Sequence, residues 1–72
     1  MKGNHFYKRL GYRIRQKRKV KYFSQEKLAF YSAIDRTYLA RIEEGKANPS
    51  VKVMYKICKV LQTRLSELLE GV

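Results

Sequence analysis

Apolar residues recur along this chain at intervals of three and four, which is the spacing of one face of an α-helix. Tyr7, Leu10 and Ile14 fall on one such face, and no alternating pattern typical of strands competes with it. The pattern predicts five helices separated by short connections. Their expected bounds are Phe6–Arg18, Gln25–Tyr31, Arg36–Glu44, Val51–Leu61 and Leu65–Leu69.

Residues that start and stop helices lie at the boundaries of this pattern. Ser24, Asp35 and Ser50 each precede a periodic segment and are good N-cap residues. Gly45 is suited to the left-handed backbone that ends many helices, and Pro49 forbids helix in the turn that follows. The corner at residues 32–34 therefore separates two short helices.

Five helices with short connections predict a compact all-α fold of one domain. We expect a flexible N-terminus over residues 1–5 and a single domain over residues 6–70, with residues 71–72 as a second loose end. Two-turn helices are marginal alone, so the second and third must dock on the first and fourth. The side chains expected to face inward are Tyr7, Leu10, Ile14, Leu28, Ala29, Leu39, Ile42, Val53, Met54, Ile57, Val60 and Leu61, with Val20 and Phe23 anchoring the first connection.

The third helix separates apolar from polar side chains. Leu39 and Ile42 face the core, whereas Arg36, Thr37 and Arg41 project away from it. Arginine can donate two hydrogen bonds to guanine, and threonine can touch a thymine methyl group or a polar base edge. A recognition helix presents its N-terminal residues to the major groove in this way. An ordinary polar helix face is the alternative, and the short preceding helix with its tight corner favours DNA.

Charge adds to this picture through its distribution. The net charge is +11, from 17 Lys and Arg against 6 Asp and Glu, and residues 1–22 hold much of the excess without any acid. Such a field attracts polyanions. A solvated basic surface or a membrane-surface helix are alternatives, but the apolar positions of the first helix are needed for the core.

Other chemistry is sparse. A single cysteine, Cys58, cannot form an internal disulfide, which fits a reducing, cytoplasmic setting, and we expect it in the core. No apolar run approaches the length of a membrane span. His5 is the one histidine, expected to be exposed, so we expect no metal and no cofactor. The sequence contains no nucleophile–base pair and no glycine-rich phosphate loop, and we expect neither an enzyme nor a small-molecule ligand.

The order and spacing of these residues resemble the phage repressor and Cro type of helix-turn-helix domain, in the class called XRE-like, over about Ile14 to Leu69. The segments that carry the resemblance are Ser24–Ala29, Ile34–Leu39, Ile42–Lys46 and Asn48–Ser50. It implies a lambda-repressor-like fold. Asp35–Tyr38 followed by Asn48–Ser50 is also similar to the controller proteins of restriction-modification systems, which are small dimeric autoregulators.

The resemblance implies a set of DNA-binding residues. Arg36, Thr37 and Arg41 match base-contacting positions, and Gln25 matches a position that contacts the DNA backbone or a base edge. Tyr38 matches a position that often reaches phosphate through its hydroxyl. The full set is Gln25, Arg36, Thr37, Tyr38, Arg41, Lys46 and Asn48, of which the last two lie in the phosphate-contacting loop.

Two further positions, Arg18 and Glu43, often pair with each other in this family, so the resemblance implies a structural role for both. Arg13 and Lys17 remain weaker phosphate candidates.

The chain departs from the family's pattern where glycine is common. Ala33 stands at the corner, Tyr22 in the loop before the second helix, and Gln62 at the exit of the fourth. If the backbone at the corner is left-handed, alanine costs about 1 kcal/mol there.

These observations together predict a sequence-specific, double-stranded DNA-binding transcriptional regulator. A homodimer built through the C-terminal helix, with Leu65, Leu68 and Leu69 as candidates, would bind a pseudo-palindromic operator. The alternatives are a protein-interaction module, such as an antitoxin-like protein or a phage adaptor, and a non-specific nucleic-acid binder.

Overall fold

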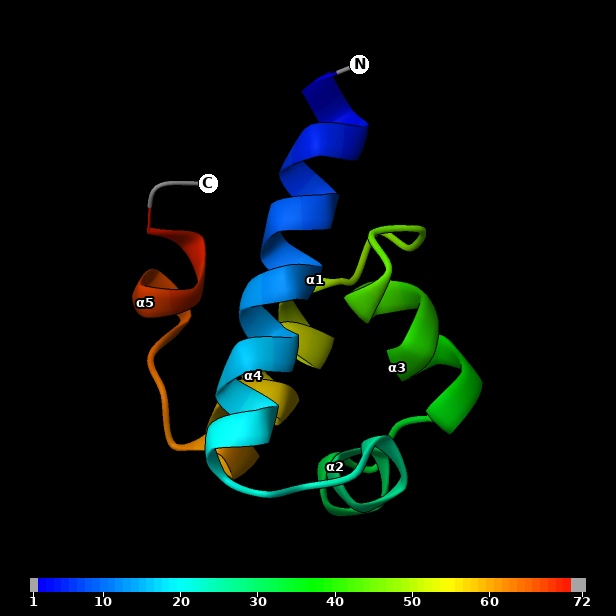
Figure 1. The fold of residues 1–72 in the computed structure, drawn as a ribbon, viewed down its shortest axis with the longest axis vertical. Helices are drawn as coiled ribbons and strands as arrows, with labels where there is room; N and C mark the ends of the chain where they lie inside the picture. Colours follow the sequence, from blue (N-terminus) through cyan, green and yellow to red (C-terminus); the bar gives the residue numbers. More distant parts are fainter. Residues whose placement is uncertain (1, 71–72) are drawn as a thin grey trace.

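The computed structural model describes residues 2–70, and within that range the chain forms five α-helices and no strands. They are α1 (Lys2–Val20), α2 (Gln25–Ser32), α3 (Arg36–Glu43), α4 (Val51–Leu61) and α5 (Leu65–Leu69). The long α1 runs through the middle of the molecule (Figure 1), with α3 packed on one side and α5 on the other. Helix α2 packs against both α3 and α4. The two short helices therefore dock on the first and fourth helices, α3 on α1 and α2 on α4, as predicted.

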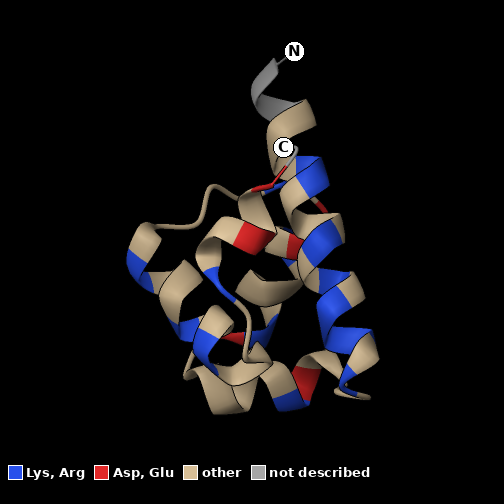
Figure 2. Cartoon of the chain, turned by 90° about the vertical axis from the view of Figure 1, so that its left-hand side faces the viewer, with Lys and Arg blue, Asp and Glu red and all other residues tan. Residues whose placement is uncertain are grey.

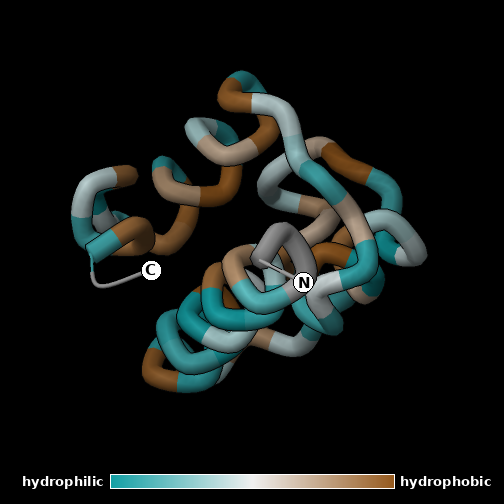
Figure 3. Tube along the Cα trace, turned by 90° about the horizontal axis from the view of Figure 1, so that it is seen from above, coloured by the Kyte–Doolittle hydropathy of each residue, from teal (hydrophilic) through white to brown (hydrophobic). Residues whose placement is uncertain are grey.

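The core lies where the apolar faces of all five helices meet. Its fully buried side chains are Ile14, Leu28, Leu39, Ile42, Ile57 and Leu68. Apolar positions recur at intervals around the helices (Figure 3), as the sequence pattern predicted. The residues expected to face inward are all buried or half-buried, with the exception of Val20.

Three helices begin with the caps that the sequence indicated. The hydroxyl of Ser24 accepts a hydrogen bond from the Lys27 backbone N–H at 3.0 Å, and the carboxylate of Asp35 accepts one from Tyr38 at 3.2 Å. Ser50 does the same for α4. Each cap satisfies a backbone donor that the first turn leaves without a partner, a contribution of about 1 kcal/mol. The starts of α2, α3 and α4 are therefore fixed locally.

The three positions where this chain lacks the family's glycine all adopt a left-handed backbone. The φ angles are 60° at Tyr22, 58° at Ala33 and 55° at Gln62, beside 76° at Gly45. A side chain at such a φ costs about 1 kcal/mol relative to glycine. The chain therefore keeps the family's turns and tolerates strain in each.

The predicted bounds of α1 and the predicted role of Val20 were wrong. Helix α1 begins at Lys2 rather than Phe6 and ends at Val20 rather than Arg18, while the flexible N-terminus over residues 1–5 stays a prediction. Met1 and residues 71–72 lie outside the described range. Val20 does not anchor the first connection, because its side chain is 74% exposed. The helix carries it to the surface, and Phe23, after the left-handed Tyr22, packs on the core instead.

A glycine inside α1 brings α1 and α3 into backbone contact. A Cβ atom added to Gly11 would lie 2.2 Å from the carbonyl oxygen of Ile42 and 2.7 Å from that of Glu43. No larger residue fits at that separation. The end of α3 is therefore held against α1 by a close approach that depends on this glycine.

Candidate nucleic-acid interface

Helix α3 presents its first turn to solvent and packs Leu39 and Ile42 against the core. The side chains of Arg36 and Thr37 are exposed, while Leu39 is 0% and Ile42 is 1% exposed. Within the described residues, Arg36 and Thr37 make no side-chain hydrogen bond or ion pair. Their donors therefore remain available to a ligand. The first turn of α3 directly follows the corner between α2 and α3 (Figure 1).

The opposite end of α3 carries a buried carboxylate. Glu43 is fully enclosed, and Arg18 of α1 donates to both of its oxygens, Nε to Oε2 at 2.7 Å and Nη2 to Oε1 at 3.0 Å. Arg18 Nη1 also donates to the Phe23 carbonyl at 2.8 Å. The implied pairing of Arg18 and Glu43 is therefore present. It ties α3 to α1 and to the loop that precedes α2.

Gln25 and Arg15 complete this cluster from its exposed side. The amide of Gln25 donates to Glu43 Oε1 at 3.0 Å, and Arg15 Nε lies 3.6 Å from the same oxygen with its side chain 41% exposed. Gln25 is thus oriented by the buried pair, and its contact with DNA stays a prediction. Arg15 was not among the predicted site residues, although its place one turn before Arg18 on the same helix face could have indicated it.

Arg41 is directed along the loop that follows α3. Its Nη2 donates to the Lys46 carbonyl at 3.0 Å, and the Lys46 backbone N–H donates to the Arg41 carbonyl at 2.8 Å. Lys46 Nζ lies 3.7 Å from Glu44, and Asn48 is exposed farther along the loop. Arg41 therefore sets the loop's position. To contact a base, Arg41 would have to give up its hydrogen bond to the Lys46 carbonyl.

Tyr38 differs from its neighbours on α3. It is half-buried and packs against the core. Its role in contacting phosphate stays a prediction. The structure thus gathers Gln25, Arg41 and Lys46 around the C-terminal end of α3, whereas Arg36 and Thr37 stand at the other end.

Arg13, a weaker phosphate candidate, is committed elsewhere. Its guanidinium donates to the Glu67 and Glu70 carbonyls, both at 2.8 Å, and so satisfies carbonyls at the end of α5. Other cations follow one another along α1 (Figure 2). The basic charge of α1 is therefore divided between arginines that bond within the fold, Arg13 on the α5 side and the buried Arg18 on the α3 side, and cations that are exposed elsewhere on the helix.

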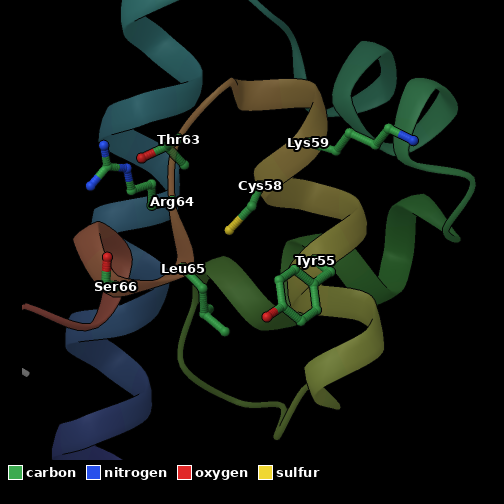
Figure 4. Close-up of a pocket in the computed structure, with 7 residues that line it drawn as sticks. All are labelled: Tyr55, Cys58, Lys59, Thr63, Arg64, Leu65 and Ser66. Atoms are coloured by element: carbon green, nitrogen blue, oxygen red, sulfur yellow. The ribbon is translucent and has the colours of Figure 1, made fainter.

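A second surface lies between α4 and α5. A hollow of about 600 Å³ is lined by Tyr55, Cys58, Lys59, Thr63, Arg64, Leu65 and Ser66 (Figure 4). Cys58 is 4% exposed, as expected of a core residue, and burial, followed by the charge of Glu67, raises the pKa of its thiol. Nearby apolar side chains stay exposed, with Val51 at 63%, Tyr55 at 61% and Leu69 at 39%.

Metal ligation and membrane crossing can both be assessed from the residues that the structure describes. No cluster of three or more metal-ligating side chains occurs among those residues. None of the helices described has the length and apolar character that crossing a membrane requires.

Comparison with known proteins places this arrangement in a family. The helix-turn-helix family model matches residues 14–68. The chain is 43% identical over 61 residues to control protein C.BamHI of Bacillus amyloliquefaciens, covering 83% of this chain and 75% of that protein. It is 39% identical over 63 residues to the HTH-type transcriptional regulator SlrR of Bacillus subtilis, covering 86% of this chain but only 41% of SlrR.

A solved structure agrees in fold. The restriction-modification controller protein C.AhdI of Aeromonas hydrophila superposes with a TM-score of 0.84 at 37% identity, covering 86% of this chain and 94% of that one. The five-helix, lambda-repressor-like prediction is confirmed by this match, and so is the resemblance to controller proteins. The chain belongs to the helix-turn-helix family of DNA-binding transcriptional regulators and control proteins.

Proposed function

We propose that this protein binds specific double-stranded DNA sequences by placing α3 in the major groove. The observation that carries the proposal is the exposed first turn of α3, with Arg36 and Thr37 lacking partners among the described residues, on a helix whose other end is buried. A rigidly held helix with free donors at its N-terminal end matches the geometry by which helix-turn-helix proteins contact bases.

The remaining residues would position the domain on the phosphates. Gln25, oriented by Glu43, stands at the N-terminus of α2, where backbone N–H groups and the helix dipole favour an anion. Lys46 and Asn48 would contact phosphate from the loop, and Arg15 from α1. Arg41 would either contact a base or hold that loop, and its present bond to the Lys46 carbonyl supports the second role. Such contacts fix register and carry no sequence information.

The active form would be a homodimer built on the α4–α5 surface. Leu68 is fully buried and closes the core. Tyr55 remains exposed at the hollow, and Val51 and Leu69 remain exposed where they line a smaller hollow of about 190 Å³. One domain of this size makes few base contacts, so a second copy related by a two-fold axis is the physical route to specificity. The operator would then be pseudo-palindromic, with half-sites about 34–36 Å apart.

We propose that occupancy of such an operator regulates transcription in the cytoplasm. A random pool of duplex DNA, enriched by several rounds of binding, tests this function directly. We expect a two-fold symmetric motif, and an equilibrium between monomer and dimer that Leu69→Ser shifts toward monomer in sedimentation.

Two results would contradict the proposal. Sequence-blind binding with a steep salt dependence would indicate a non-specific binder. Weak DNA binding beside a tight protein partner would indicate an interaction module.

A further inference from the structure

The first two-thirds of α1 precede the residues that the family model matches. They nevertheless contact α3 and the loop that follows it. The family model begins at residue 14, whereas α1 begins at Lys2. A Cβ added to Gly45 would lie 2.6 Å from both Cα and Cγ of Lys8, so α1 and the loop after α3 touch at this point. Lys8 therefore emerges beside Lys46, the predicted phosphate contact of that loop.

Lys8 and Arg15 lie on the side of α1 that faces α3 and the loop after it, whereas Arg9 lies about 100° further round the helix from Lys8. Lys8 and Arg15 are two helical turns apart, and Gly11 between them touches the backbone of α3. Two turns span about 10 Å along the helix, comparable to three base pairs of B-DNA. Lys8 and Arg9 are exposed and, with His5, Tyr12 and Arg13, line a shallow hollow of about 370 Å³.

The same end of α1 also adjoins the proposed dimer surface. A second hollow of about 190 Å³ is lined by Phe6 of α1, Asn48 and Pro49 of the loop, and Leu65 and Leu69 of α5, among others. The loop after α3 thus joins the recognition side of the molecule to the α4–α5 surface. In the proposed dimer, with α3 in the major groove, the edge where these surfaces meet would face the DNA between the two half-sites.

We propose that Lys8, which continues the line of contacts that begins at Lys46, contacts the phosphates of the spacer between the half-sites, together with Arg9 on the rim of the same hollow. This inference rests on the proposed function, because it requires a dimer on an operator. Lysine and arginine at phosphates contribute affinity without base preference. The contacts would give α1 a role in binding strength and in the length of spacer that the dimer accepts.

The test removes charge from the proposed contact in the DNA and, separately, in the protein. Methylphosphonate groups, which carry no charge, replace the spacer phosphates of the selected operator, and in a second duplex they replace phosphates outside the half-sites. The proteins are wild type, Lys8→Gln/Arg9→Gln, and the control Lys52→Gln/Lys56→Gln. The control loses the same two charges from α4, which packs on α2 and α5.

The wild type should lose about tenfold in affinity when the spacer is neutral. Lys8→Gln/Arg9→Gln should bind the unmodified operator about tenfold less tightly than wild type does. Neutralising the spacer should then lower the affinity of this variant by less than about a further threefold. Its slope of log affinity against log salt concentration should be smaller by about 2. The control should keep the sensitivity of wild type. A charge-retaining variant, Lys8→Arg/Arg9→Lys, should bind as wild type does, and circular dichroism confirms that each variant is folded.

The inference is overturned if Lys8→Gln/Arg9→Gln remains as sensitive to spacer neutralisation as wild type, or if it behaves as the control does. In either case the selected operator still stands, and the proposed function survives. If wild type selects no operator at all, the proposed function and this inference fail together.

Discussion

The two ends of α3 differ in almost every physical respect. At the N-terminal end, Arg36 and Thr37 are exposed and make no bond within the described chain. At the C-terminal end, Glu43 is fully enclosed by Arg18 and Gln25, and the backbone touches Gly11. One end is therefore fixed in the protein while the other keeps its donors free.

This difference shows how an eight-residue helix can be a reliable binding element. A helix of that length is marginal in isolation, so its direction must come from tertiary contacts. The ion pair of Glu43 and the close backbone approach at Gly11 both lie at the end farthest from Arg36. Substitutions at the fixed end should therefore change stability, and substitutions at the free end should change binding and leave stability intact.

The largest effect is expected from Glu43→Gln. This change leaves the Arg18 guanidinium buried without its counter-charge, and breaking such a pair costs about 3–5 kcal/mol. The free energy of unfolding, measured by urea denaturation, should fall by that amount. Glu44→Gln is the matched control because it makes the same chemical change at an exposed residue whose ion pair with Lys46 spans 3.7 Å. Its loss should stay below about 1 kcal/mol, and equal losses for the two variants would remove the distinction between the ends of α3.

Gly11→Ala should be the next most damaging substitution. The added Cβ would meet the Ile42 carbonyl oxygen at 2.2 Å, and backbone atoms have no rotamer by which to move away. We expect α1 and α3 to separate at a cost of about 3 kcal/mol in thermal or chemical unfolding. Gln16→Ala, on the exposed side of the same helix, should be neutral within about 0.5 kcal/mol. An unchanged midpoint for Gly11→Ala would show that α3 is not held by this close approach.

Ala33→Gly should stabilise the protein by about 0.5–1 kcal/mol, because glycine relieves the left-handed backbone at the corner before α3. The same substitution inside α3, Ala40→Gly, should destabilise by about 1 kcal/mol, since glycine is unfavourable in a helix interior. Denaturation curves recorded together give the comparison. If both substitutions changed stability in the same direction, the left-handed backbone at Ala33 would not be the cause of the strain.

The smallest effect concerns Cys58, away from α3. Burial, followed by the charge of Glu67, raises the pKa of its thiol. The buried neutral thiol therefore contributes fully to folding stability below the ordinary pKa of a thiol. This contribution to stability is lost as the pH rises through the raised pKa of Cys58. Reaction with a disulfide reagent at pH 8 should be about tenfold slower for the native protein than for the urea-unfolded chain. Equal rates would place the thiol at the surface.

The sequence predicted the local features of this fold well because their causes are local. Ser24, Asp35 and Ser50 cap helices through hydroxyl or carboxylate groups that bond within their own first turn, and each start was confirmed. The early start of α1 was missed because no capping residue marks it. Val20 was misplaced because the left-handed turn at Tyr22 was not foreseen.

Contacts between distant segments were less accessible. Arg13 was named as a weaker phosphate candidate, and its partners are carbonyls more than fifty residues away, at Glu67 and Glu70. Gly11 gave no signal within a helical pattern, since the reason for it lies in α3. Arg18 and Glu43 were paired through family resemblance. The DNA-contacting roles of Arg36 and Thr37 remain predictions that the fold supports by leaving both exposed.

The most direct test of this account is the base preference of Arg36→Ala, determined by selection from random duplexes and accompanied by its unfolding midpoint. We predict an unchanged midpoint and a motif that loses its preference at one base pair, symmetrically in both half-sites, with affinity for the original operator lower by about 1–3 kcal/mol. A variant that selects the same motif with the same affinity would contradict the claim that the free end of α3 contacts the bases.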